Sequence, residues 1–260
     1  MSLFGRKAEI NCEGLTLDSE ALDIEFDVPF DNDVEPNKSS IKIYNLTDDT
    51  INRFKRNKKL ILNAGYKGDI GVILSGYISR TKTARQGVDK VTTINVLDSE
   101  PLDTQKTLNK TYKKNIKASQ IINDLLSILK LDATVNLARN RTYSKGYTVD
   151  GEIVEALANI AKDCGVTFFM SKGKAYISGI HSGEASQFTL SEETGLIGTP
   201  AIFEEDGHSG FSVTCLLQHR IATANAVTLQ SEIADGKFYV YKGKHRWSGS
   251  EFVTELDIIY

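Results

Sequence analysis

Apolar and polar residues alternate with a period of two at the start of the stretch 39–54, and the pattern then becomes helical. Isoleucines that alternate with Lys42 and Tyr44 predict a half-buried strand. Thr47 can cap a short helix over residues 48–56, which begins with two aspartates where the helix dipole favours negative charge. Two apolar residues three positions apart would share one face of that helix. The predicted core residues of this strand and helix are Ile41, Ile43, Ile51 and Phe54.

Five basic residues cluster at the end of this predicted helix. Cations near the carboxyl end of a helix are stabilised by its dipole, so a solvated helix end is the simpler interpretation. Contact with an anionic partner surface is the alternative, and its candidate interface residues are Arg53 and Arg56. The complete cluster is Arg53, Lys55, Arg56, Lys58 and Lys59.

Strand patterns dominate the first hundred residues. Gly76 lies in the middle of one predicted strand, where a glycine indicates a bulge or a bend. Five or six antiparallel strands close most simply into a small barrel or split barrel, because closure removes exposed edges. We therefore expect residues 1–98 to form a first tube-like β-barrel domain. Besides the strand described above, its predicted strands are 8–12, 22–28, 60–66, 71–79 and 88–97.

The apolar period changes from that of strands to that of helices after residue 98. Apolar stripes predict helices over 119–130 and 152–164, and Gly165 is suited to end the second. A hairpin that turns at residues 171–174 follows. Residues 99–183 are therefore predicted to form a compact α+β module.

Strand patterns return in residues 184–260, which are predicted to form a second tube-like β-barrel domain. A polar loop over 243–250, which holds Trp247, separates the last two predicted strands. The expected fold class is thus α+β and mainly β, with two small antiparallel tube-like (split) β-barrels and an α+β module between them. The predicted strands of the last domain are 187–190, 211–217, 226–231, 236–241 and 252–258.

Composition places the chain among ordinary globular proteins. It has 260 residues, 40% of them hydrophobic, and a net charge of -3, which gives no reason to expect general affinity for nucleic acid. No apolar run approaches the roughly 18 residues of a membrane helix, and no signal peptide is evident. We expect the protein to fold in a cytoplasm. Cys12, Cys164 and Cys215 are odd in number and far apart, which predicts three buried or half-buried thiols rather than disulfides.

The sequence shows no constellation of residues that enzymes use. The four histidines lie in different segments without a second ligand at metal-binding spacing. The run Glu204–Asp206 is expected to be a solvated loop, because a glycosidase holds its two carboxyl groups apart on rigid elements. We expect no enzymatic activity, no cofactor and no metal.

Trp247 is the single tryptophan of the chain and a candidate interface residue. An aromatic side chain at this place can cover a barrel mouth or a subunit interface. With Tyr239 it could instead bind a sugar, which would make the chain a carbohydrate-binding β protein.

Several segments in order resemble one family of proteins. The succession IKIYNLTDDTINRF, LILNAGY, GVILSGYIS and VTTINVLDSEPL is similar to the N-terminal part of baseplate hub proteins. These occur in contractile-tailed phages, defective prophage particles and R-type tailocins, and are related to the late control protein D group. The segments KASQIINDLLSILKL and GKFYVYKGKHRWSGSEFVTELDI also fit. This sequence differs from the family in one loop, which has the pattern H-x-G-D-x-x-G-x-x-W in the family. Here the segment after His245 lacks the aspartate, and its tryptophan is at another position.

The resemblance implies a structural protein of a contractile injection system. Members form homotrimeric rings, in which two tube-like barrels per subunit imitate the six-fold tail tube. The implied partners are other copies of the chain, the tail tube protein above, the spike protein below and other baseplate proteins. No membrane and no sequence-specific nucleic acid is implied. The expected location is the virion tail baseplate, assembled in the bacterial host cytoplasm.

Two expectations complete the sequence-based picture. The chain ends directly after its last predicted strand, so we expect any cell-wall-degrading activity to lie on another polypeptide. The alternative within the same fold is another tail-tube component, a distal tail or tube-initiator protein, which would be hexameric.

Overall fold

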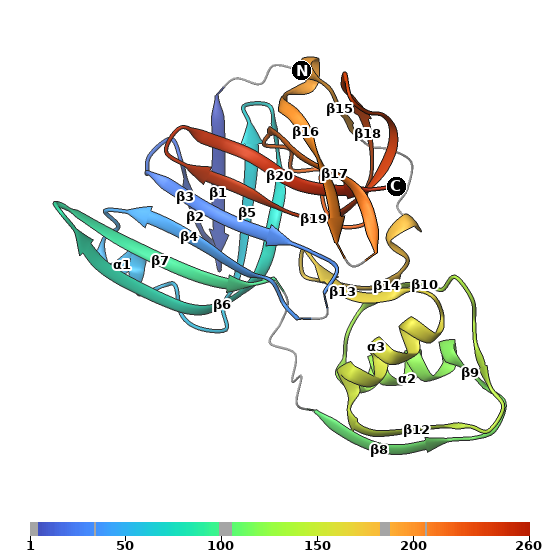
Figure 1. Ribbon diagram of the computed structural model, residues 1–260. Helices are drawn as coiled ribbons and strands as arrows, with labels where there is room; N and C mark the ends of the chain where they lie inside the picture. The colour runs from blue at the N-terminus through green and yellow to red at the C-terminus, as the bar shows by residue number, and fades with distance from the viewer. Residues whose placement is uncertain (1–4, 34, 99–105, 183–187, 206) are drawn as a thin grey trace.

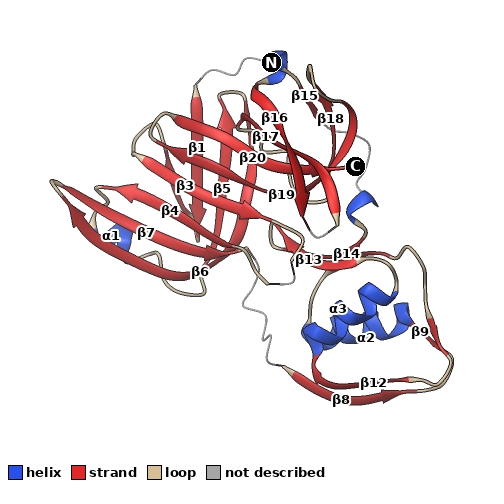
Figure 2. Ribbon diagram, viewed as in Figure 1, coloured by secondary structure: helices blue, strands red, loops and turns tan. Residues whose placement is uncertain are grey.

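The computed structural model describes residues 5–33, 35–98, 106–182, 188–205 and 207–260. Strands predominate among them, and the two longer helices lie together in one module (Figure 2). The prediction of a mainly β fold is confirmed.

Thirteen strands form one sheet that contains both the N-terminal and the C-terminal β regions. Its order is β16-β17-β20-β19-β3-β4-β7-β6-β5-β1-β2, and β18 with β15 branches from β19. All neighbours are antiparallel except β15 and β18. The strands are β1 (Arg6–Cys12), β2 (Leu15–Asp18), β3 (Ile24–Phe30), β4 (Lys38–Tyr44), β5 (Lys59–Tyr66), β6 (Asp69–Gln86), β7 (Asp89–Leu97), β15 (Phe188–Leu190), β16 (Leu196–Glu205), β17 (His208–Leu216), β18 (Ala226–Gln230), β19 (Asp235–Ser248) and β20 (Glu251–Ile259).

The two β regions are joined through β3 and β19. These strands pair from Phe30 opposite Gly243 to Phe26 opposite Trp247, more than two hundred residues apart in sequence. Because the outer edge of β3 is used for this pairing, the strand path stays open and ends at β16 and β2. The split-barrel form of each region therefore stays a prediction.

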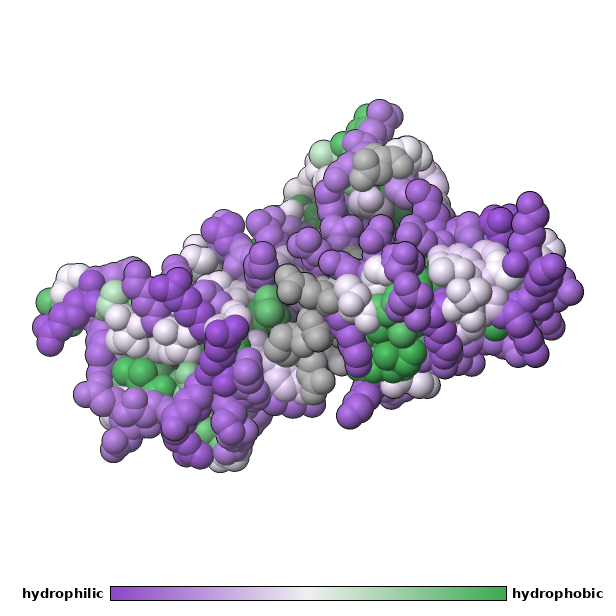
Figure 3. All heavy atoms as spheres, turned by 90° about the horizontal axis from the view of Figure 1, so that it is seen from below, coloured by the Kyte–Doolittle hydropathy of each residue, from purple (hydrophilic) through white to green (hydrophobic). Residues whose placement is uncertain are grey.

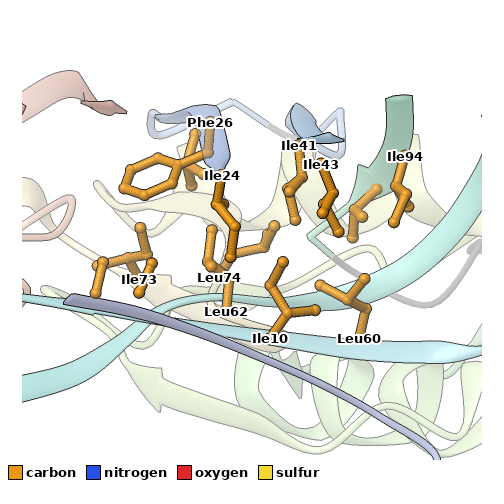
Figure 4. Close-up of a cluster of buried hydrophobic side chains, with 14 of the residues drawn as sticks. Ile10, Ile24, Phe26, Ile41, Ile43, Leu60, Leu62, Ile73, Leu74 and Ile94 are labelled. Carbon is orange, nitrogen blue, oxygen red and sulfur yellow. The ribbon is translucent and has the colours of Figure 1, made fainter. Parts of the chain in front are cut away.

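The core of the first region lies between two halves of the curled sheet. Figure 4 shows side chains of β3, β4 and β7 pointing toward those of β1, β5 and β6. Ile41 and Ile43 are fully buried there, Phe54 is buried, and Ile51 is half-buried against the same cluster. These are the four residues for which the sequence predicts core positions.

The helix within this region is shorter than predicted. α1 covers only Asp48–Ile51, although Thr47 caps it as expected by accepting a hydrogen bond from the Thr50 backbone N–H at 3.3 Å. The chain then continues in tighter turns, in which the backbone N–H groups of Arg53 and Phe54 donate hydrogen bonds to carbonyl oxygens three residues earlier. The prediction of helix over residues 48–56 is therefore wrong after Ile51.

Strand β6 is longer than predicted, and Gly76 within it is not a bulge. Register shifts occur on both sides of Gly76, at Leu62/Asn63 of the β5 pairing and at Ile78/Arg80 of the β7 pairing. Gly76 itself pairs in register with Leu60. A Cβ at this position would lie 2.0 Å from the Leu97 carbonyl oxygen, so the glycine permits close approach of the backbones.

The middle module has a core of its own beside the large sheet (Figure 1). Both predicted helices are present, and Gly165 ends the second with φ +76°. A parallel and an antiparallel pairing join β10, β14 and β13 into a small sheet, which α3 contacts through β13 and which shares one core with both helices. Its elements are β8 (Thr107–Tyr112), β9 (Ile116–Lys117), α2 (Ala118–Leu129), β10 (Ala133–Asn136), β11 (Thr142–Tyr143), β12 (Tyr147–Glu152), α3 (Ile153–Asp163), β13 (Thr167–Ser171) and β14 (Lys174–Ser178).

The predicted domain boundaries stay predictions. The first predicted boundary lies between residues 98 and 99, and the second between residues 183 and 184. They adjoin or fall within the segments 99–105 and 183–187, which lie outside the described residues. Two short 3-10 turns, η1 (Ile180–Ser182) and η2 (Glu192–Thr194), lie on either side of the second segment.

The cores of the two β regions interlock at their junction. Phe30 of β3 lies in the core of the C-terminal region, whereas Leu217 and Phe252 of the C-terminal region lie in the core of the first. The two regions therefore cannot separate without exposing buried apolar side chains.

Candidate functional site

Three parts of the chain meet at the tip of the β13–β14 hairpin. Lys172 (φ +49°) and Gly173 (φ +80°) form its tight turn, as predicted for residues 171–174. A Cβ on Gly173 would lie 3.0 Å from the Ser75 carbonyl oxygen of β6. The Lys172 ammonium donates to the His219 carbonyl oxygen at 2.8 Å. The hairpin of the middle module thus contacts the first β region and also the connection between β17 and β18.

An ion pair connects the same two regions. Arg220 donates to both carboxylate oxygens of Asp69, at 2.6 and 2.8 Å, and the His219 ring lies 3.0 Å from Oδ1. The Arg220 hydrogen bonds hold the pKa of Asp69 down at about 2. Gly71 leaves room for His219, because a Cβ there would lie 2.1 Å from the ring nitrogen Nδ1. These contacts hold the start of β6 against the second region.

A buried carboxylate lies at the end of β7. Asp98 accepts hydrogen bonds from the backbone N–H of Asn37 at 2.9 Å and from its side-chain amide at 3.1 Å. Burial raises the pKa of Asp98 to about 7. Asp98 and Lys172 line a common cavity of about 10 Å³, which has room for no more than about one water molecule.

His245, the one match to the histidine of the family loop, is a core residue. Its ring is fully buried, lies 4.9 Å from that of Phe30 and has Nδ1 at 2.9 Å from the Thr254 hydroxyl. Burial lowers the pKa of His245 to about 3, so the ring is neutral at physiological pH. Its position is that of a packing residue between β19, β20 and β3.

The predicted interface residues Arg53 and Arg56 are both exposed. Arg53 donates to the Glu13 carbonyl oxygen at 3.4 Å, and the neighbouring Lys58 pairs with the Glu13 carboxylate at 2.9 Å. The helix ends at Ile51, before the cluster, so its dipole is not what places these cations. Both interpretations of the cluster, solvation and contact with a partner, stay predictions.

Trp247 lies in a strand rather than in the predicted loop. β19 continues to Ser248, so the prediction of a loop over 243–250 is wrong except at its last two residues. The indole ring is half-buried and packs edge-on against Phe26 and Phe252, at centroid distances of 6.1 and 4.8 Å. Tyr239 lies eight residues earlier on the same strand, on the order of 25 Å away. The two aromatic rings cannot hold one sugar ring between them.

A groove of about 610 Å³ lies on the face of the C-terminal region, lined by residues of β16, β17, β19, β20 and the end of β3. Both of its lysines are in ion pairs, whereas Asp31 and Asp257 accept hydrogen bonds from Asn37 and Ser212. Lys244 binds Glu255 at 3.1 Å, and Lys242 binds Glu205. The groove therefore offers few free charges to a ligand.

The described part of the chain offers neither a metal site nor a membrane-spanning helix. No group of three or more His, Cys, Asp or Glu side chains there is placed to hold a metal ion. None of the helices described is long and apolar enough to cross a membrane. Cys12, Cys164 and Cys215 are all buried free thiols, as predicted.

The interlocking residues carry no signal that sequence reasoning could have used. In the sequence, Asp69 has the pattern of a turn residue. Its partners His219 and Arg220 follow about 150 positions later, after an apolar strand. The β3–β19 pairing is equally hidden, because strand alternation states which face is buried but not which strand lies beside it.

The chain has the fold of several phage tail proteins. No protein-family model matches it, and no curated protein matches it by sequence. A tail protein from Neisseria meningitidis superposes with a TM-score of 0.71 at 12% identity, with 99% of this chain and 97% of that chain covered. The 43 kDa tail protein of prophage MuSo2 from Shewanella oneidensis gives 0.70 at 9% identity, with 98% of each chain covered.

A third similar structure comes from a secretion system. The E. coli c3393 protein, described as a component of the type VI secretion system with structural similarity to the T4 tail proteins gp27 and gp5, gives a TM-score of 0.68 at 12% identity. The match covers 96% of this chain and 76% of that one. At these identities the likeness establishes the fold.

Proposed function

We propose that this protein is a structural component of a phage or phage-like contractile tail, located in the baseplate hub. In this proposal three copies form a ring with pseudo-six-fold symmetry, which joins the tail tube above to the central spike below. Each β region of each subunit supplies one tube-like split barrel, so that three subunits present six.

The observation that carries the proposal is the end-to-end likeness to phage tail proteins. The superposition covers nearly all of both chains, so the order of β region, α+β module and β region is shared as a whole. The order of family-like segments along the sequence supports the same assignment independently.

The junction described above suits a ring subunit. The interlocked cores and the Asp69–Arg220 ion pair hold the two β regions in one orientation. A ring of three closes only if each subunit presents its two contact surfaces at a constant angle. A flexible linker between the regions would not supply that angle.

Stoichiometry tests the proposal. We would measure the mass of the purified chain, alone and with the tail tube and spike proteins of its own particle, and image the assembly by electron microscopy. We expect three copies and six β units around one axis. A stable monomer in the presence of the tube protein would refute the hub, and six copies in the ring would favour a distal tail or tube-initiator protein.

The proposal includes no enzymatic activity. The pure protein is expected to leave cell-wall material intact in a turbidity assay. Reproducible clearing that disappears on changing a single carboxylate would contradict a purely structural role.

A further inference from the structure

Two of the open edges of the sheet, the outer edge of β16 and the free end of β6, lie at opposite ends of the molecule and differ in the charge around them. β16 pairs only with β17, so within the described residues its outer edge carries no strand. At the other end, β6 pairs with β5 only up to Tyr77, while its pairing with β7 continues to Gln86. Thr81 still contacts the loop after α1 through the Phe54 carbonyl oxygen. Beyond it, the β5 side of Lys82–Gln86 is open among the described residues.

The end of the β6–β7 hairpin therefore forms an arm, defined here as residues 80–90. Figure 1 shows the arm at the far left and β16 at the upper right. A chain cannot bring its own arm to its own β16 across this distance. Within one copy, neither of these two edges can therefore supply the partner strand of the other.

The charges around the two edges are complementary. The arm carries Arg80, Lys82, Arg85 and Lys90 and a single carboxylate, Asp89. Residues 192–205, which include β16 and the turn before it, carry four glutamates and no Lys or Arg. The arm is thus mainly basic and the surroundings of the β16 edge are acidic.

Several of these charges are free to meet a partner. Arg80, Lys82 and Arg85 of the arm are exposed and make no ion pair with the residues described. The same holds for Glu192 and Glu193 just before β16 and for Glu204 near its end. An exposed apolar side chain lies at each place, Val88 in the turn at the tip of the arm (95% exposed) and Ile202 on β16 itself (80% exposed).

Seen from below, the molecule is mostly hydrophilic, with small separate hydrophobic areas (Figure 3). A long open edge with an apolar residue is a site for strand addition, which natural proteins otherwise cover. Charge complementarity then selects the strand that binds.

We infer that the arm of one copy adds to the β16 edge of a neighbouring copy, with its cations against the carboxylates that flank that edge. This contact is head-to-tail, so it repeats from copy to copy and can close a ring. The inference rests on the ring of the proposed function and assigns the surfaces that meet in it.

Charge reversal of each edge tests the contact. The arm-reversed variant carries Arg80→Glu, Lys82→Glu and Arg85→Glu. The edge-reversed variant carries Glu192→Lys, Glu193→Lys and Glu204→Lys. A third variant carries all six changes. The control, Lys113→Glu with Lys114→Glu, reverses two exposed cations in the turn between β8 and β9.

We expect either single-edge variant to associate at least about tenfold more weakly than the wild type in sedimentation equilibrium, because like charges then face each other. The variant with all six substitutions restores charge complementarity with the signs exchanged, so it should associate again. The control should behave as the wild type, and added salt should weaken all the assemblies. Circular dichroism shows whether each variant is folded.

The outcomes separate this inference from the function on which it rests. If the wild type forms trimers that neither reversal weakens, the edge contact is wrong and the hub stands. If both reversals weaken assembly but the variant with all six substitutions does not restore it, the pairing of these two edges is wrong. If the wild type stays monomeric at low salt and high concentration even with the tail tube protein present, the trimer and the edge contact both fail.

Discussion

Arg220 holds Asp69 with two guanidinium nitrogens across 151 positions of the chain. The pair fastens the start of β6 to the connection after β17. It lies beside the interlocked cores and beside the hairpin of the middle module, whose Lys172 donates to the carbonyl of the adjacent His219. The relative placement of the three parts therefore depends on a few contacts that can be tested singly.

Removing the Asp69 carboxylate should destabilise the protein at neutral pH. The pKa of Asp69 is lowered from 3.8 to about 2, a difference that corresponds to about 2 kcal/mol at pH 7. Since the folded pKa is the lower one, this stability is present above about pH 4 and is lost as the pH falls toward 2. We expect the wild type and Asp69→Asn to differ in urea unfolding at pH 7 and to converge near pH 2. An equal difference at both pH values would contradict the ion pair.

The buried Asp98 should make the protein less stable as the pH rises, which is the opposite of the effect of Asp69. Its pKa is raised to about 7 in the folded state, so the unfolded chain loses the proton more readily and stability falls as the pH rises from about 4 to 7. Asp98→Asn removes the titrating group and should flatten this part of the stability profile. The exposed Asp49→Asn serves as the control for the substitution itself. A wild-type stability that is constant from pH 4 to 7 in thermal melts would be evidence against a buried, protonated Asp98.

Phe54 should contribute more to stability than its neighbour Ile51. Phe54 is 3% exposed in the first core, so Phe54→Ala is expected to cost about 3–5 kcal/mol in denaturant unfolding. Ile51 is only partly buried against the same core, and Ile51→Ala should cost less. Equal costs for the two, or a cost near zero for Phe54, would mean that the segment after α1 does not anchor this core.

Gly76 should not tolerate a side chain. A Cβ there would meet the Leu97 carbonyl oxygen at 2.0 Å, so Gly76→Ala must push β6 away from the end of β7. We expect a loss of about 1–3 kcal/mol, the usual cost of overpacking. Gly179→Ala, where a Cβ meets nothing within 4 Å, is the matched control. Melting temperatures that are the same for both variants would show that the backbones at Gly76 can separate freely.

Local pattern alone predicted much of the secondary structure and part of the core. The alternation around Ile41 and Ile43, the stripes of α2 and α3 and the turn at 171–174 are all statements about near neighbours in sequence. Thr47 capped its helix as predicted, because capping also involves adjacent residues. Predictions were wrong where tertiary contacts extended or cut an element. β19 runs through the expected loop to Trp247 because β3 and β20 pair with it there, and α1 stops at Ile51 as the chain tightens toward the strand of Leu60.

The sequence by itself determined the buried face where the apolar period was clear, in β4, α2 and α3, since periodicity reports the face that avoids water. It also determined that basic and acidic residues are gathered in separate segments. Only the tertiary structure decided that β3 lies beside β19, that Phe30 and Phe252 cross between cores, and that Asp69 finds Arg220. The physical reason is that burial is a property of each residue, whereas the choice of a partner strand depends on the packing of the whole chain.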